Sequence, residues 1–186
     1  MRKRTQIICL HEGVYNSVDS LFARAFIKRY SPSWLRPFHN NSCRLVPLTD
    51  KTTLRKKFPA ELKACLAMGG DTTLVVLADV DDDCENPEAL KEKYWNQAKN
   101  EGISKENFEK VVFIFPKDRI ENWIEFLNTG TTDEMQEGPR VGDDEAREAG
   151  QKLASICSSG QDIPNIPPSL EWSCQNWKRL VNRMQS

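Results

Sequence analysis

Four short apolar runs divide the chain, and helical spacing follows each of them. The runs cover residues 5–10, 43–48, 72–78 and 110–115. Valine, isoleucine and leucine dominate them, as is typical of strands covered on both faces of a sheet. Pro47 indicates that the second run ends there or lies at a sheet edge.

Apolar residues at helical spacing predict six helices. They cover residues 17–30, 51–68, 87–101, 119–128, 144–157 and 169–184. We expect an interruption of the second helix near Phe58 and Pro59, because proline removes a backbone hydrogen bond from a helix interior. Strands that alternate with helices predict a three-layer α/β domain with a mostly parallel sheet of about four strands.

A polar stretch separates this domain from the C-terminal helices. Residues 129–143 contain glycine and have no apolar period, so we expect a mobile loop there. The predicted α/β domain covers residues 1–128. Residues 129–186 then form the loop and a helical C-terminal extension that packs on the domain.

Composition favours a globular protein. Of 186 residues, 39% are hydrophobic and 28% charged. No apolar run approaches the roughly 20 residues that span a bilayer, and the apolar run near the N-terminus is short. We therefore expect a cytoplasmic protein with no membrane partner. The six cysteines are widely spaced and form no CxxC pair, so we expect most of them to be reduced and several to lie in the core.

Acidic residues follow three of the four predicted strands. Glu12 follows the first, Asp79 and Asp81 follow the third, and Glu121 lies six residues after the fourth. The carboxyl ends of parallel strands meet at one edge of a sheet, where these carboxylates would repel one another. A hard divalent cation relieves that repulsion. We predict a Mg²⁺ site, also open to Mn²⁺, with Glu12, Asp79 and Asp81 as ligands and Asp83 as an outer ligand.

Each acid also has a plainer interpretation. The aspartate run suits a solvated loop, and Glu121 suits the first turn of a helix, where the helix dipole favours acids. The next predicted helix begins only at Pro87, however, which leaves Asp79 too distant to cap it. Glu12 follows a different strand, and this also favours a shared site.

The order of these motifs resembles the TOPRIM fold, the topoisomerase–primase domain that also occurs in OLD-type nucleases. The resemblance rests on HEG at residues 11–13 and LADVDDD at residues 77–83. FPKDRIENWI at residues 115–124 is similar to a segment of small stand-alone OLD-like TOPRIM proteins of bacterial defence systems. The resemblance covers residues 5–128 and, loosely, the tail. His11 departs from the pattern, because an apolar residue is more usual at that position.

The resemblance implies metal-dependent phosphodiester hydrolysis. The residues it implies for catalysis or metal binding are Glu12, Asp79 and Asp81, with Glu121 as a further catalytic residue. Lys117 and Arg119, beside Glu121, are candidates to offset charge on the phosphate. The expected function is a Mg²⁺-dependent nuclease acting on DNA or RNA, as the effector of an anti-phage defence system.

The partners follow from the same interpretation. The net charge is −1, so nucleic acid would bind through local basic clusters. These are Arg24, Lys28, Arg29 and Arg36, and residues 55–57. The alternative is a non-catalytic TOPRIM-like subunit that binds an ATPase encoded nearby through its C-terminal helices. A phosphoacceptor domain fits less well, because it would need its acidic pair after the first strand.

Overall fold

A four-stranded sheet forms the centre of the molecule in a computed structural model that describes residues 6–30, 43–69, 72–160 and 162–185. The strands are β1 (Gln6–His11), β2 (Cys43–Pro47), β3 (Thr72–Leu77) and β4 (Val112–Ile114). Their spatial order is β2-β1-β3-β4, and every pair is parallel. The predicted α/β class and parallel sheet are confirmed.

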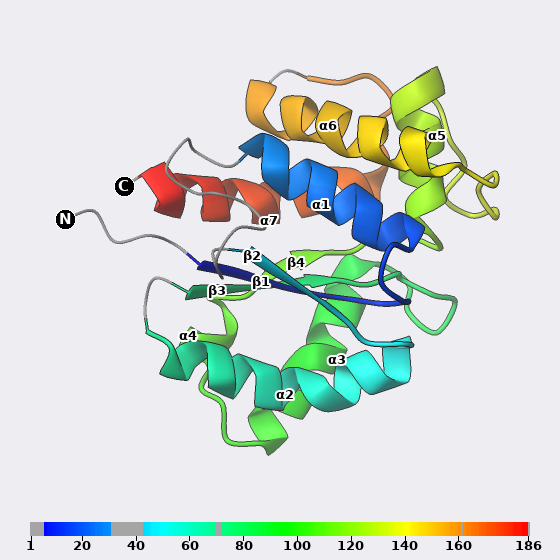
Figure 1. Cartoon of the computed structure of the whole chain (residues 1–186). Helices are drawn as coiled ribbons and strands as arrows, with labels where there is room; N and C mark the ends of the chain where they lie inside the picture. The colour runs from blue at the N-terminus through cyan, green and yellow to red at the C-terminus, as the bar shows by residue number, and fades with distance from the viewer. Residues whose placement is uncertain (1–5, 31–42, 70–71, 161, 186) are drawn as a thin grey trace.

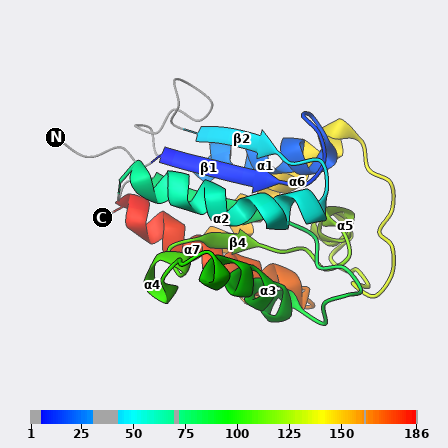
Figure 2. The ribbon, with the colours of Figure 1, turned by 90° about the horizontal axis from the view of Figure 1, so that it is seen from below.

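Helices cover both faces of this sheet (Figure 1). In the described residues they are α1 (Val18–Tyr30), α2 (Lys51–Ala67), α3 (Pro87–Asn100), α4 (Lys105–Phe108), α5 (Ile120–Thr129), α6 (Asp143–Ser159) and α7 (Pro168–Gln185). Helices α1, α5, α6 and α7 lie on one face, and α2, α3 and α4 lie on the other. Figure 2 shows α2 and α3 running across the second face. None of the described helices is long and apolar enough to cross a membrane.

The alternation of β3 divides the core into two halves. Val75 and Leu77 point to the face covered by α1 and α7, whereas Leu74 and Val76 point to the α2 and α3 face. Large aromatic side chains fill both halves, so packed side chains cover each face of the sheet. Phe22, Trp123 and Trp177 lie in the first half, and Phe58, Tyr94 and Phe113 in the second.

The C-terminal helices are part of the same layer as α1. Helix α6 lies along α1, and α7 lies against β4. The Ser173 hydroxyl of α7 accepts a 3.0 Å hydrogen bond from the backbone N–H of Phe115. The helical extension therefore completes one face of the sheet.

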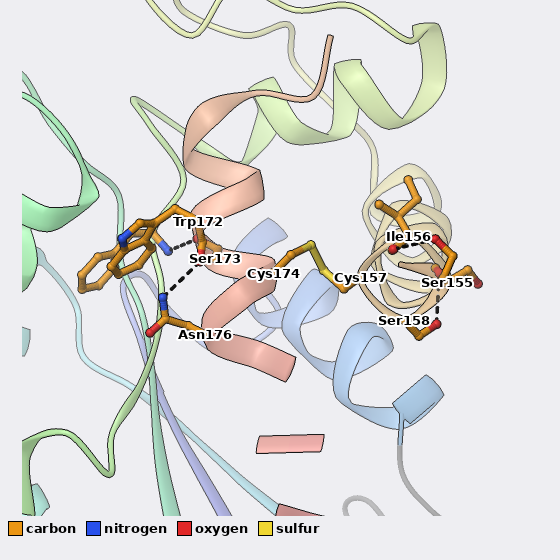
Figure 3. The surroundings of a disulfide bond; sticks show 10 residues. Ser155, Ile156, Cys157, Ser158, Trp172, Ser173, Cys174 and Asn176 are labelled. Carbon is orange, nitrogen blue, oxygen red and sulfur yellow. Dashed lines mark hydrogen bonds between the residues drawn. A yellow bond between two sulfur atoms is a disulfide. The ribbon is translucent and has the colours of Figure 1, made fainter. Parts of the chain in front are cut away.

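A disulfide joins α6 to α7 (Figure 3). It links Cys157 and Cys174, which are 17 residues apart. This pair is the exception to the prediction that most cysteines are reduced, because packing of two helices brings together cysteines that no spacing motif relates. The other four cysteines are buried thiols, as expected of core residues.

Helix α2 differs from its predicted form. It is continuous from Lys51 to Ala67 with Pro59 inside it, so the expected interruption is wrong. Phe58 and Pro59 are both buried on α2, and their packing offsets the loss of one backbone hydrogen bond. The short helix α4, capped by the Ser104 hydroxyl, had not been predicted.

Candidate metal centre

Three strands end in the same row of the sheet. His11, Leu77 and Ile114 are the last residues of β1, β3 and β4, and they are paired with one another in register. The loops that follow must therefore start side by side. Glu12 and Asp79 leave the sheet from this row, and the Asp79 backbone N–H donates a 3.3 Å hydrogen bond to Glu12 Oε1.

The structure adds a carboxylate that sequence reasoning had missed. Asp19 lies in the first turn of α1, which returns over the same edge. A Cβ built on Gly13 would lie 4.0 Å from Asp19 Oδ2, so this carboxylate is directed toward the turn after Glu12. The place of Asp19 in the sequence could have indicated this. It lies in the first turn of a helix that follows a strand, and such a turn begins at the carboxyl end of that strand.

Five carboxylates therefore share this edge, and we call them the acidic cluster. They are Glu12, Asp19, Asp79, Asp81 and Glu121. Glu121, in the first turn of α5, adds its charge to the repulsion felt by Asp19 and Asp79. The predicted convergence of Glu12, Asp79, Asp81 and Glu121 agrees with this geometry.

Burial and the neighbouring carboxylates disfavour negative charge at Glu12, Asp19 and Asp79. Burial, followed by the charges of Asp81 and Asp19, raises the pKa of Glu12 to about 7. Burial and the charge of Glu121 raise the pKa of Asp19 to about 6. The pKa of Asp79 is raised well above its usual range by burial and by the four other carboxylates. The cluster therefore favours whatever neutralises it, whether protons or a cation.

Asp79 is the least satisfied member of the cluster. Its Oδ1 atom is buried and has no hydrogen-bond partner among the described residues. Burial of a carboxylate oxygen without a hydrogen-bond partner costs free energy, because the atom gives up hydrogen bonds to water and forms none in their place. The donor set around it consists of hard oxygen atoms, which suits Mg²⁺ or Mn²⁺.

Asp81 and Asp83 have basic partners. Lys51, the first residue of α2, places Nζ 2.6 Å from Asp81 Oδ2. Asp83 lies farther along the loop and pairs with Lys93 at 2.8 Å and Arg55 at 3.6 Å. Asp83, predicted as an outer ligand, is thus held toward α2 and α3 rather than toward Asp79.

Lys117 and Arg119 are directed to other groups. Lys117 Nζ donates a 2.9 Å hydrogen bond to the Cys84 carbonyl oxygen. Arg119 forms a 2.5 Å ion pair with Glu137. The two cations predicted to serve the phosphate thus have contacts outside the acidic cluster.

The predicted basic clusters are separated by the fold. Lys28 and Arg29 lie in the last turn of α1, at the opposite end of that helix from Asp19. Arg55 lies one turn along α2 from Lys51, close to the acidic edge. Arg36 lies outside the described residues.

His11 has a role in holding Glu12. The imidazole is fully buried, and its Nδ1 lies 2.7 Å from the backbone carbonyl oxygen of Glu12. Burial lowers the pKa of His11, so the neutral ring donates its one N–H from Nδ1 to that carbonyl. This contact orients the turn from which the Glu12 side chain projects.

A buried serine fixes the turn after β4. The Ser169 hydroxyl accepts hydrogen bonds from Trp123 Nε1 at 2.9 Å and from the Lys117 backbone N–H at 3.1 Å. It donates to Glu134 of the polar loop. The Asn122 side chain donates to the carbonyl of Gln136 at 3.1 Å. The loop predicted as mobile is thus held against α5 and α7.

The cluster is not a closed ligand set. Within the described ranges, no three His, Cys, Asp or Glu side chains are spaced to hold a metal ion as they stand. Comparison with protein-family models, with curated proteins and with solved structures finds no match to this chain. Functional assignment therefore rests on the residues themselves.

Proposed function

We propose that this protein is a cytoplasmic, Mg²⁺-dependent nuclease of the TOPRIM type that hydrolyses phosphodiester bonds in nucleic acid. The observation that supports this most is Asp79. Its buried Oδ1 has no hydrogen-bond partner in the part of the chain that the structure describes, and burial and four other carboxylates raise its pKa. A defence role, as in the OLD-like proteins it resembles, is part of the same proposal and rests on the motifs alone.

The electrostatic argument starts from the cost of the metal-free state. Carboxylates that gather at one edge raise one another's pKa values, and a nearby cation offsets this repulsion. Lys51 supplies one positive charge, at Asp81, on the α2 side. Asp79, Asp19 and Glu121 lie toward α1 and α5, and a divalent ion there would supply the missing charge.

Each residue then has a definite task. Asp79 and Glu12 would hold the ion, since the hydrogen bond from the Asp79 backbone N–H to Glu12 Oε1 already connects their turns. Asp81, Asp19 and Glu121 would supply further carboxylate oxygens to the ion or to its water. When bound, Mg²⁺ would acidify a water molecule and neutralise charge on the phosphate. His11 holds the turn that carries Glu12 through the hydrogen bond to the Glu12 backbone carbonyl oxygen.

The test is a paired binding and cleavage assay. Purified protein is titrated with Mn²⁺ by calorimetry and incubated with single- and double-stranded DNA and RNA in Mg²⁺ or Mn²⁺. Asp79→Asn should lose both metal binding and cleavage. Asp82→Asn is the matched control, because Asp82 is an exposed member of the same run and should retain both. Wild-type protein that binds no divalent ion would overturn the proposal.

A second candidate is a non-catalytic subunit that binds a partner ATPase. The contacts of Lys117 and Arg119 with Cys84 and Glu137 favour it, because they leave the phosphate without these cations. Metal binding that Asp79→Asn removes, with no cleavage of any of the four nucleic acids, would support this candidate. The same assay separates the two functions.

A further inference from the structure

Lys51 occupies a position that helix stability does not explain. It is the first residue of α2, whose N-cap is Asp50 and whose first turn contains no acid. The positive end of a helix dipole disfavours a cation there. The position brings Lys51 to the acidic cluster, where Nζ lies 2.6 Å from Asp81 Oδ2.

The Lys51–Asp81 pair lies at the boundary between the cluster and solvent. The side chains are 41% and 35% exposed, so the pair is open to exchange. An exposed ion pair is worth only a small free energy, and a divalent ion competes for a carboxylate oxygen far better than an ammonium group does. The charge of Lys51 also reaches Glu12, where it offsets a small part of the effects that raise the pKa of that carboxyl. Lys51 thus lies beside the acidic cluster, on its α2 side.

We propose that Lys51 holds Asp81 in the metal-free protein, yields that carboxylate to the divalent ion, and then binds a non-bridging oxygen of the substrate phosphodiester. This inference rests on the proposed function and deepens it, since it names the residue that receives the phosphate. The flexible four-carbon stem keeps Nζ near the ion after it leaves Asp81. Arg55 and Lys93 lie next to it on the α2 and α3 side.

This arrangement indicates the side from which the nucleic-acid backbone would reach the site. Lys117 and Arg119, on the β4 side, contact Cys84 and Glu137. Lys51 and Arg55 are one turn apart on α2, and Lys93 faces them from α3. Because Lys51 is the first residue of α2, the nucleic-acid backbone would approach across the N-terminal turn of α2 rather than across α5.

The test compares Lys51→Met with Lys63→Met. Both lysines belong to α2, and Lys63 also forms an exposed ion pair, at 3.3 Å to Glu101. Two quantities are measured for each variant: the affinity for Mn²⁺ alone, by calorimetry, and the affinity for a short oligonucleotide in Ca²⁺ at several salt concentrations, by fluorescence anisotropy. Thermal melting confirms that each variant is folded, and Lys51→Arg retains the charge.

The expected result is a pair of opposite effects. Lys51→Met should bind Mn²⁺ about two- to fivefold more tightly, because an exposed ion pair no longer competes for Asp81. It should bind the oligonucleotide more weakly, with a salt slope reduced by about one. Lys63→Met should match wild type in both assays, and Lys51→Arg should match wild type in Mn²⁺ affinity.

The contrary results are distinguishable from failure of the proposed function. Unchanged or weaker Mn²⁺ binding by folded Lys51→Met would overturn the exchange at Asp81, provided that Asp79→Asn still abolishes binding. Unchanged oligonucleotide affinity would overturn the phosphate contact. Wild-type protein that binds no Mn²⁺ would instead overturn the proposed function, and this inference with it.

Discussion

The backbone N–H of Asp79 donates a 3.3 Å hydrogen bond to Oε1 of Glu12, although the two residues are 67 positions apart in the chain. The bond connects the turn after β1 to the turn after β3. It also lowers the pKa of Glu12, but burial and the charges of Asp81 and Asp19 outweigh it. One bond therefore draws together two carboxylates that repel each other.

The first prediction concerns the cost of Asp79 in the metal-free protein. Asp79→Asn removes a carboxylate whose pKa is raised by burial and by its neighbours. We expect the free energy of unfolding at pH 7.5 to rise, because the folded variant no longer holds a carboxylate whose negative charge burial and its neighbours disfavour. Urea denaturation in the presence of a chelator measures the change.

The control for this variant is again Asp82→Asn. Asp82 is exposed, so its replacement should change the free energy of unfolding by less than about 0.5 kcal/mol. Excess Mn²⁺ should stabilise wild type and the control but not Asp79→Asn. A loss of stability in chelator by Asp79→Asn would mean that its carboxylate is well satisfied without metal.

The second prediction is the pH dependence of stability. The folded-state pKa values of Glu12 and Asp19, about 7 and about 6, lie above the ordinary values of 4.5 and 3.8. Between these limits the folded state binds more protons than the unfolded state. Stability of the metal-free protein should therefore fall as pH rises from 5 to 7.5.

Denaturation midpoints across this pH range check the prediction. With saturating Mn²⁺, metal replaces the protons and the slope should become flatter or reverse. Lowered pKa values at Asp83 and Glu109 oppose the trend at lower pH, and the lowered pKa of His11 opposes it below the ordinary histidine value of 6.5. The raised pKa values of Glu12, Asp19 and Asp79 outweigh this one histidine. Metal-free stability that rises steadily from pH 5 to 7.5 would contradict the proton binding assigned to the cluster.

Much of the fold follows from local patterns in the sequence. The apolar run that became β3 is buried on both faces, and the run at residues 110–115 contains β4. Glu12 and Asp79 could be placed at one edge because parallel strands share their direction. The predicted interruption of α2 at Pro59 was wrong. The rule that proline breaks a helix does not include the packing of Phe58 and Pro59 into the core.

The rest of the site depends on contacts between distant residues. Asp19 belongs to the cluster because α1 returns over the sheet edge, which apolar periodicity does not reveal. Likewise, no local pattern relates Lys51 to Asp81, 30 positions away. The sequence could place Lys117 and Arg119 at this edge of the sheet. It could not give the direction of their side chains, because that depends on contacts with Cys84 and Glu137.

The third prediction concerns the disulfide between α6 and α7. Reduction of Cys157–Cys174 should lower the free energy of unfolding by about 3 kcal/mol, because it frees a loop closed over 17 positions in the unfolded chain. Thermal melting with and without a thiol reductant measures this. The Cys157→Ser, Cys174→Ser double variant is the control, and its melting should not respond to the reductant. A wild-type melting temperature that ignores complete reduction, verified by thiol labelling, would contradict this role.

The last prediction connects helix packing to the acidic cluster. Gly150 lies where α6 crosses α1, and an added Cβ would lie 2.6 Å from the carbonyl oxygen of Phe22 and 3.0 Å from the backbone nitrogen of Phe26. Gly150→Ala must therefore push α6 away from α1. We expect a loss of about 1–3 kcal/mol in the free energy of unfolding, as for overpacked cores.

The same displacement should reach the candidate metal site, since α1 carries Asp19 in its first turn. Gly150→Ala should therefore weaken Mn²⁺ binding at a temperature where the variant remains folded. Ser155→Ala, an exposed change on α6, should leave both stability and Mn²⁺ affinity close to wild type. A destabilised Gly150→Ala that binds Mn²⁺ with wild-type affinity would show that the placement of Asp19 does not depend on the α1–α6 contact, and that the ion depends on the sheet-edge residues Glu12 and Asp79.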